Sequence, residues 1–178
     1  PADAARLRAH YFDARNMTDA AHALVLLAAR KGPDTEAALA HFHDRWKADH
    51  LVIDTWFSAQ AVSPLPSTLD QVRTLSAHPL FQITTPNKAR ALIGNFAAMN
   101  PVQFNRPDGE GYDFVADKVL EIDHFNPQVA ARMLNAFRSW RALEADRRKL
   151  ARKALQRIHR NQGLSRDVLE IVSRMLEV

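Results

Sequence analysis

The sequence contains no cysteine, so it can form neither a disulfide nor a metal site built on thiolates. It also lacks any apolar run near the roughly 18 residues that a membrane-spanning helix needs. The first residues, 1–8, do not have the apolar core of a secretory signal peptide. We therefore expect no membrane partner, and we predict a cytoplasmic protein, because a cysteine-free chain suits a reducing compartment.

The short motifs that mark many catalytic sites are missing as well. The chain has no H-E-x-x-H zinc helix, no G-x-S-x-G nucleophile turn, and neither of the phosphate loops G-x-G-x-x-G and G-x-x-x-x-G-K-[ST]. Each of these motifs places a nucleophile, a metal ligand or a phosphate-binding backbone at a fixed spacing. No catalytic residue and no metal ligand is therefore predicted within this chain.

What the sequence does have is the composition of a folded protein, with 47% apolar and 25% charged residues in 178 positions. That length supports one hydrophobic core, so we assign residues 1–178 to a single domain. Apolar residues recur every three or four positions, and no segment alternates with period two. The pattern predicts an all-α protein.

Helix-start signals divide the chain into segments. Asn16 or Thr18 can cap one helix, and the pairs Thr85–Pro86 and Asn126–Pro127 each combine a cap with a proline in the first turn. Helices are expected over about 2–14, 17–31, 34–48, 51–62, 67–77, 86–99, 112–125, 127–140, 144–160 and 165–176. Short connections make neighbouring helices antiparallel, so we expect helical hairpins of about 30 to 45 residues, the size range of helical-repeat arrays.

The segment NPVQFNRPDGEGYDF, residues 100–114, is predicted to interrupt this array. It holds two of the five glycines and two of the nine prolines, which favours an open loop. Asp108, Glu110 and Asp113 offer carboxylate oxygens to a calcium ion, but the ligand spacing of a calcium loop and its closing glutamate are absent. We interpret the segment as a loop that docks on another surface or lines a cavity, with a plain connector as the alternative.

Histidines and basic residues form two further clusters. On a helix over residues 41–50, His41 and His43 lie about 200° apart and cannot converge on one metal ion, so we expect surface or partly packed histidines. The segment 138–160 holds nine Lys and Arg residues against two acids, which suits contacts with the phosphates of a nucleic acid. Its basic residues alternate with an apolar stripe, however, so a solvated outer face is favoured and a nucleic-acid partner is not expected.

The helix expected over 127–140 carries a different kind of polar face. Gln128, Arg132, Asn135 and Ser139 recur at spacings of four, three and four, and so share one narrow stripe. The stripe has a single charge, whereas a freely solvated face usually carries more Lys and Glu. This indicates a concave surface that receives a polar ligand, with an ordinary exposed face as the alternative.

Five blocks of the sequence carry a resemblance to a known family. They read AHYFDARNMTDAAHAL, VSPLPSTLDQVRTLSAHPLF, PNKARALIGNF, NPVQFNRPDGEGYDF and FNPQVAARML, and GEGY and NPQVA are the most specific parts. Together they resemble the C-terminal helical-repeat domain of bacterial aminopeptidase N, the alanyl aminopeptidase branch of the gluzincin zinc metallopeptidases. The resemblance runs from about residue 8 to the C-terminus.

The resemblance implies a superhelical array of antiparallel helix pairs, similar to armadillo or HEAT repeats, that closes over the catalytic domain of the same polypeptide. It implies that peptide substrates pass through an enclosed cavity, with Arg90, Gln128 and Arg132 at substrate-binding positions that face it. It also implies zinc as the cofactor of the parent enzyme, which removes N-terminal residues from peptides.

The zinc motif and the G-A-M-E-N substrate loop of that family are absent from this chain. We therefore expect a non-catalytic domain that by itself binds no stoichiometric zinc and cleaves no peptide. The alternative is a free-standing helical-repeat module that binds a protein or a nucleic acid through residues 138–160. An H-E-x-x-H motif upstream in the same reading frame would exclude that alternative.

Overall fold

The computed structural model describes residues 2–177, and all regular structure within that range is helical, which confirms the all-α prediction. The α-helices are α1 Ala2–Phe12, α2 Met17–Ala28, α3 Pro33–Trp46, α4 Ile53–Ala61, α5 Thr68–Leu75, α6 Pro86–Ala89, α7 Asn95–Met99, α8 Pro101–Phe104, α9 Glu110–Asp123, α10 Pro127–Met133, α11 Ala145–His159 and α12 Arg166–Leu176. Three shorter helical pieces are the π-helix η1 Arg90–Gly94 and the 3-10 helices η2 Leu134–Phe137 and η3 Trp140–Ala142. None of the helices described is long and apolar enough to cross a bilayer.

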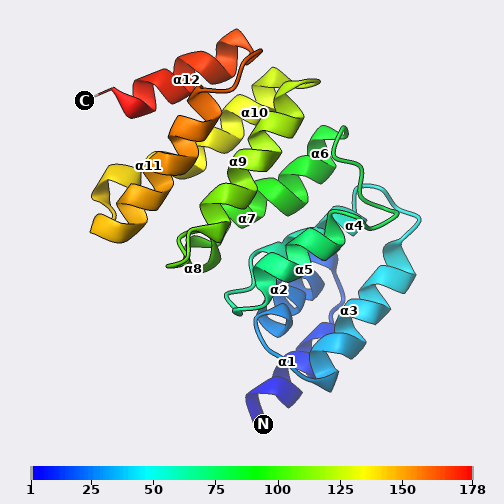
Figure 1. Ribbon diagram of the computed structural model, residues 1–178. Helices are drawn as coiled ribbons and strands as arrows, with labels where there is room; N and C mark the ends of the chain where they lie inside the picture. The colour runs from blue at the N-terminus through cyan, green and yellow to red at the C-terminus, as the bar shows by residue number, and fades with distance from the viewer. Residues whose placement is uncertain (1, 178) are drawn as a thin grey trace.

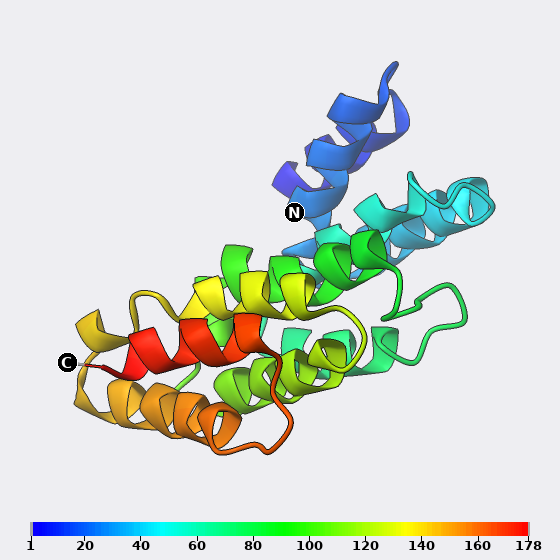
Figure 2. The same cartoon turned by 90° about the horizontal axis from the view of Figure 1, so that it is seen from above.

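The helices pack side by side in an array that runs from α1 at one end to α12 at the other (Figure 1). In the N-terminal part α2 contacts α1, α3 and α4, and in the C-terminal part α9 contacts α10 and α11, which are in turn covered by α12. Seen from above, the N-terminal helices stand at an angle to the C-terminal ones, so the array twists along its length (Figure 2). This is the arrangement of helix pairs that the short connections predicted.

Side-chain caps fix where several helices begin. The Asn16 side chain accepts a hydrogen bond from the backbone N–H of Asp19 at 2.9 Å, so Asn16 and not Thr18 caps α2. Asn126 caps α10 in the same way through Val129 at 3.1 Å. Thr85 precedes Pro86 at the start of α6, but its side chain makes no capping hydrogen bond.

The prediction of an open loop over 100–114 is wrong. Asn100 accepts a hydrogen bond from the backbone N–H of Gln103 at 3.1 Å and so caps the short helix α8, with Pro101 in its first turn. Helix α9 already begins at Glu110, which leaves only residues 105–109 as a connection. The Asn-Pro pair at 100–101 is the same start signal as the pair at 126–127.

The two glycines of this segment serve contacts inside the domain. Gly109 has a φ of 79°, in the left-handed region that favours glycine, and ends the turn before α9. Gly111 lies within α9 against the end of α8, where an added Cβ would sit 2.4 Å from the carbonyl oxygens of both Gln103 and Phe104. Close approach of α8 and α9 therefore requires glycine at position 111.

A second departure from prediction lies in the segment after α10. A single α-helix was expected over 127–140, but the chain tightens into 3-10 turns after Met133. Leu134, Phe137 and Trp140 are spaced by three, so tighter winding with three residues per turn brings all of them to one side. All three are buried, and the Trp140 indole N–H donates to the Met175 carbonyl of α12 at 3.0 Å.

We predict that Gly111→Ala lowers the free energy of unfolding by about 1–3 kcal/mol or more, because backbone must move to admit the methyl group. Gly94→Ala is the matched control, since Gly94 is also helical and its added Cβ would come no closer than 3.4 Å to any neighbouring atom, the Arg90 Cγ being the nearest. Chemical denaturation of both variants measures the difference. Equal stabilities of the two variants would contradict the role assigned to Gly111.

His78 provides a pH-dependent contribution to stability. Burial, together with the nearby His43, lowers the pKa of His78 below its ordinary 6.5, and its Nδ1 accepts a hydrogen bond from the Leu80 backbone N–H at 3.2 Å. The stabilisation is therefore complete above about pH 6.5, the pKa of the unfolded chain, and is lost as the pH falls through the folded pKa. Proton uptake at Nδ1 removes the acceptor.

We predict that the melting temperature of the wild-type chain falls more steeply between about pH 7.5 and pH 5.5 than that of His78→Asn, which keeps an acceptor but cannot titrate there. Thermal unfolding followed by circular dichroism over this range tests it. Parallel curves for the two proteins would show that His78 makes no such contribution.

Candidate functional site

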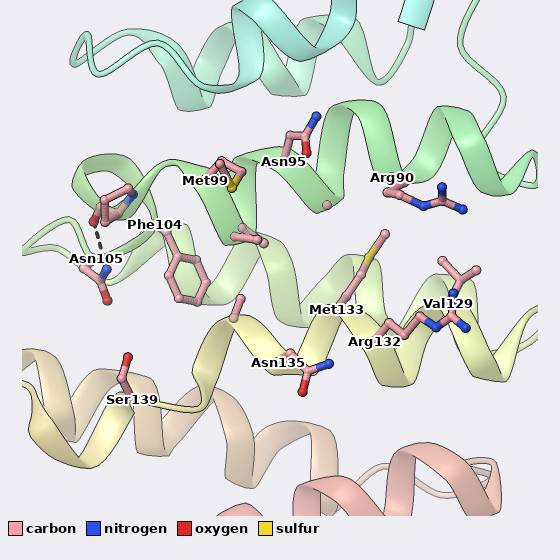
Figure 3. Close-up of a pocket in the computed structure, with 15 residues that line it drawn as sticks. Arg90, Asn95, Met99, Phe104, Asn105, Val129, Arg132, Met133, Asn135 and Ser139 are labelled. Atoms are coloured by element: carbon pink, nitrogen blue, oxygen red, sulfur yellow. Dashed lines mark hydrogen bonds between the residues drawn. The ribbon is translucent and has the colours of Figure 1, made fainter. Parts of the chain in front are cut away.

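A groove of about 500 Å3 lies between the helical run 86–99, which comprises α6, η1 and α7, and the run formed by α10 and η2 (Figure 3). One wall is lined by Arg90, Gly94, Asn95, Ala97, Ala98 and Met99, the other by Val129, Arg132, Met133, Asn135, Ala136 and Ser139, and Pro101, Phe104 and Asn105 contribute from the segment of α8. The volume is in the range of small-ligand and peptide side-chain sites.

The groove contains two positive charges and no negative one. Arg90 on η1 and Arg132 on α10 are both exposed, and Figure 3 shows their side chains at the same end of the groove, on opposite walls. Neither takes part in any of the ion pairs found within residues 2–177. Two guanidinium groups without counter-charges make this end of the groove suited to an anion, above all a carboxylate or phosphate.

The remainder of the groove combines amides with apolar side chains. Asn95 and Asn135 line it from opposite walls, with the Asn95 side chain turned toward α4, and Ser139 lies toward the end away from the arginines (Figure 3). Met99, Phe104 and Met133 supply apolar surface between them. Such a lining can hydrogen-bond to an extended backbone and accept apolar groups attached to it.

The polar stripe predicted on 127–140 is present, since Gln128, Arg132, Asn135 and Ser139 are all exposed. Three of them line the groove together with Arg90. Gln128, one turn before Arg132 on α10, lies outside the lining, so a contact between Gln128 and a ligand stays a prediction.

Sequence reasoning missed the part of the groove formed by Asn95, Phe104 and Asn105. The last two were hidden by the loop prediction for 100–114, although the Asn-Pro signal at 100–101 was available to find α8. No pattern in the sequence indicated that Asn95 lines the groove, because its position depends on how the π-helix η1 rotates the residues around it.

The residues considered as metal ligands have other partners. Within residues 2–177 no group of three or more His, Asp or Glu side chains is placed to hold a metal ion. His41 hydrogen-bonds to the Tyr11 hydroxyl at 3.0 Å, Asp108 pairs with Arg106 at 2.8 Å, and Glu110 pairs with Arg73 at 3.0 Å. The donor set present therefore does not fit a zinc or calcium site.

The basic segment 138–160 divides into paired and unpaired residues. Arg157 pairs with Asp117 and Asp113 of α9, and the Arg147 Nε donates to the Asn105 carbonyl at 2.6 Å. Arg141, Arg148, Lys149 and Arg152 instead surround an open hollow beside Trp140 and form no ion pair with a described residue. We call this second feature the basic hollow.

The twisted array and its groove define the class of protein, a helical-repeat domain with a groove between the run 86–99 and the run of α10 and η2. The chain belongs to the family described as "Domain of unknown function (DUF3458_C) ARM repeats", whose profile matches residues 1–177. ARM repeats are the armadillo-type helix arrays that the fold displays, so sequence family and architecture agree.

Several proteins named aminopeptidase N are similar in sequence to this chain. The chain is 42% identical over 172 residues to "Aminopeptidase N" of Caulobacter vibrioides and 36% identical over 166 residues to that of Escherichia coli, covering 97% and 93% of this chain. It spans only 20% and 19% of the length of those two proteins.

A solved structure gives the same result. The aminopeptidase A of Legionella pneumophila, crystallised in complex with aspartic acid, superposes with a TM-score of 0.89 at 32% identity over 97% of this chain and 20% of its own. The chain is thus a C-terminal ARM-repeat domain of the aminopeptidase N type, as its sequence blocks predicted.

Proposed function

We propose that this chain is the non-catalytic C-terminal domain of a zinc-dependent aminopeptidase N, and that its groove lines the cavity through which peptides reach the catalytic domain. The observation that carries the proposal is that Arg90 and Arg132, which form no ion pair within residues 2–177, lie together at one end of the groove. The rest of the groove is made mainly of amides and apolar side chains. A peptide presents the complementary set of groups: a terminal carboxylate, a backbone of donors and acceptors, and side chains of mixed polarity.

In this proposal Arg90 and Arg132 hold the C-terminal carboxylate of a short peptide. A guanidinium can donate two parallel hydrogen bonds to a carboxylate, which fixes the orientation of the peptide as well as its position. Asn135 is then placed to hydrogen-bond to the peptide backbone, and Gln128 extends the same polar stripe beyond the groove.

The proposal assigns bond cleavage and zinc to parts of the parent enzyme outside this chain. Zinc would polarise a water molecule for attack on the first peptide bond. The residues of this chain would bind and orient the peptide downstream of that bond and exclude water from the covered part of the cavity. Its protein partner is then the catalytic domain of the same polypeptide, and we place the enzyme in the cytoplasm.

A second candidate function rests on the basic hollow. Arg148 and Arg152 lie four residues apart on α11, where like charges repel by a few tenths of a kcal/mol, and no acidic residue lines the hollow beside them. The phosphates of a nucleic acid would supply the negative charge that the hollow lacks. Binding of a short oligonucleotide that weakens steeply with salt and is lost in Lys149→Glu, but not in the same substitution at Lys153 outside the hollow, would support this function.

We predict that Arg132→Ala in the full-length enzyme lowers kcat/KM about tenfold to a hundredfold for tripeptides with a free C-terminal carboxylate, since it removes charge-assisted hydrogen bonds. The same peptides with an amidated C-terminus should be cleaved equally by both enzymes. Gln128→Ala should cost less, about twofold to tenfold, because a neutral hydrogen bond is weaker.

Arg138→Ala is the matched control, because Arg138 is exposed nearby but does not line the groove. Its kcat/KM should equal that of the wild type for both kinds of peptide. If Arg132→Ala leaves cleavage of the free-carboxylate peptides unchanged, the groove does not bind peptides in the way proposed.

A further inference from the structure

The helical run 86–99 is not a uniform α-helix. Between α6 and α7 it widens into the π-helix η1, in which the Asn95 backbone N–H reaches back five residues to the Arg90 carbonyl. π-Helical turns are rare, and single turns of this kind are frequent at functional sites. Compared with a regular α-helix, one extra residue in a turn rotates the residues before the turn by about 100° relative to those after it. The π turn therefore decides which way the side chain of Arg90 points.

The effect on Arg90 is visible in the burial pattern. Lys88, Ala89, Ala91, Leu92 and Ile93 are all buried, and Arg90 is the one exposed residue in the stretch 88–93. The residues before and after Arg90 are thus packed in the core, and within 88–93 only the Arg90 side chain is directed out to the groove.

Gly94 lies beside the stem of the Arg90 side chain. It follows Arg90 by four residues and lines the groove, and an added Cβ at Gly94 would lie 3.4 Å from the Arg90 Cγ, an ordinary van der Waals distance. The stem of Arg90 therefore runs past Gly94 toward the groove.

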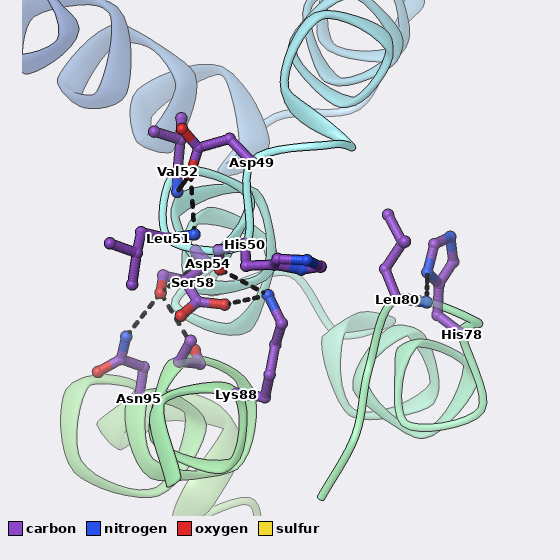
Figure 4. Close-up of polar contacts among 11 residues, drawn as sticks. Asp49, His50, Leu51, Val52, Asp54, Ser58, His78, Leu80, Lys88 and Asn95 are labelled. Carbon is purple, nitrogen blue, oxygen red and sulfur yellow. Dashed lines mark hydrogen bonds and ion pairs between the residues drawn. The ribbon is translucent and has the colours of Figure 1, made fainter. Parts of the chain in front are cut away.

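A polar contact from α4 holds the π turn from behind (Figure 4). The Ser58 hydroxyl lies within hydrogen-bonding distance of the Ala91 carbonyl of η1, at 3.2 Å, and of the Asp54 carbonyl of its own helix, at 2.8 Å. The Asn95 side-chain amide donates to the same hydroxyl oxygen at 2.9 Å. Ser58 thus connects the middle of the π turn to its end.

The turn before η1 is also fixed to α4. The Lys88 ammonium, only 7% exposed, pairs with Asp54 at 2.6 Å and donates to the His50 carbonyl at 2.9 Å (Figure 4). A buried ion pair with an additional hydrogen bond has one favoured geometry. It prevents the helix from rotating to relax the π turn.

We propose that Ser58 is a positioning residue, which holds the π turn of η1 so that Arg90 points into the groove and can meet the carboxylate of a peptide. The inference rests on the proposed function of the groove. Ser58 itself does not line the groove, and it acts through the Ala91 carbonyl and Asn95.

The test is a double-mutant cycle in the full-length enzyme. Ser58→Ala removes the contacts to the Ala91 carbonyl and from the Asn95 amide, and should raise KM about threefold to tenfold for peptides with a free C-terminal carboxylate, with kcat unchanged. Ser58→Ala should not change the KM for amidated peptides. It should also have no further effect on KM in an Arg90→Ala background, because the guanidinium that Ser58 positions is then absent. The proposal would be overturned if the KM increases of Ser58→Ala and Arg90→Ala multiplied in the double mutant, or if Ser58→Ala alone had the KM of the wild type.

Ser76→Ala is the matched control. The Ser76 hydroxyl also donates to a carbonyl four residues earlier, that of Val72 at 2.8 Å, and is likewise half-buried, but it lies at the C-terminal end of α5 and makes no hydrogen bond to η1. Comparable melting temperatures of the two variants would exclude a general loss of stability as the cause of the KM change. Their peptide kinetics should differ.

A second measurement separates this inference from the proposed function. The Nε–H signal of Arg90 in NMR reports the mobility of its side chain without any peptide. Its order parameter should fall in Ser58→Ala and stay unchanged in Ser76→Ala, and no change in Ser58→Ala would overturn the positioning role. If Arg90→Ala leaves peptide cleavage unaffected while the Ser58→Ala order parameter falls, the function proposed for the groove fails and the positioning role stands.

Discussion

The groove exists because the helical run 86–99 must bury most of its circumference. α4 and α5 pack against η1 on one side, while α8 and η2 contact α7 on the other, so that this run joins the N-terminal and C-terminal parts of the array. Leu92, Ile93 and Phe96 are fully buried by these neighbours. A helix packed in this way has little surface left for polar groups, and that surface lies at the seam between the two parts. Arg90 of the run therefore lines the groove there together with Arg132 and Asn135 from the opposite wall.

Helices and their starts were readable from the sequence because they are determined locally. The spacing of apolar residues specified the helices, and Asn16 and Asn126 cap them with their own side chains. The polar stripe over 127–140 was readable from the same spacing, although only Arg132 lies on α10, and Asn135 and Ser139 reach the groove from η2 and the turn after it. The loop prediction over 100–114 failed because composition was given more weight than the Asn-Pro signal.

What the sequence did not predict depends on contacts between distant residues. The π turn at Arg90 involves Ser58, more than thirty residues earlier. The 3-10 winding near Trp140 is accompanied by a hydrogen bond to Met175, and the glycine at 111 is required by the carbonyls that end α8. In each case the local sequence allows several conformations, and tertiary packing selects one. These are also the places that shape the groove, because α7, α8 and η2 form its walls.

Charged residues in this domain serve two different purposes. Arg73 with Glu110 and Arg157 with Asp117 join one helix to another, and their charges are neutralised within the array. Arg90 and Arg132 have no such partner among residues 2–177 and lie in the groove. Because an unpaired guanidinium contributes little to the packing of the array, its place in a groove is best explained by a ligand that brings the missing negative charge.

A crystal structure of the full-length enzyme with a non-hydrolysable tripeptide analogue tests the central claim most directly. The account predicts the C-terminal carboxylate of the analogue in the groove, about 2.7–2.9 Å from guanidinium nitrogens of Arg90 or Arg132, with its backbone along Asn135. A groove filled by side chains of another domain, with the carboxylate bound elsewhere, would contradict it.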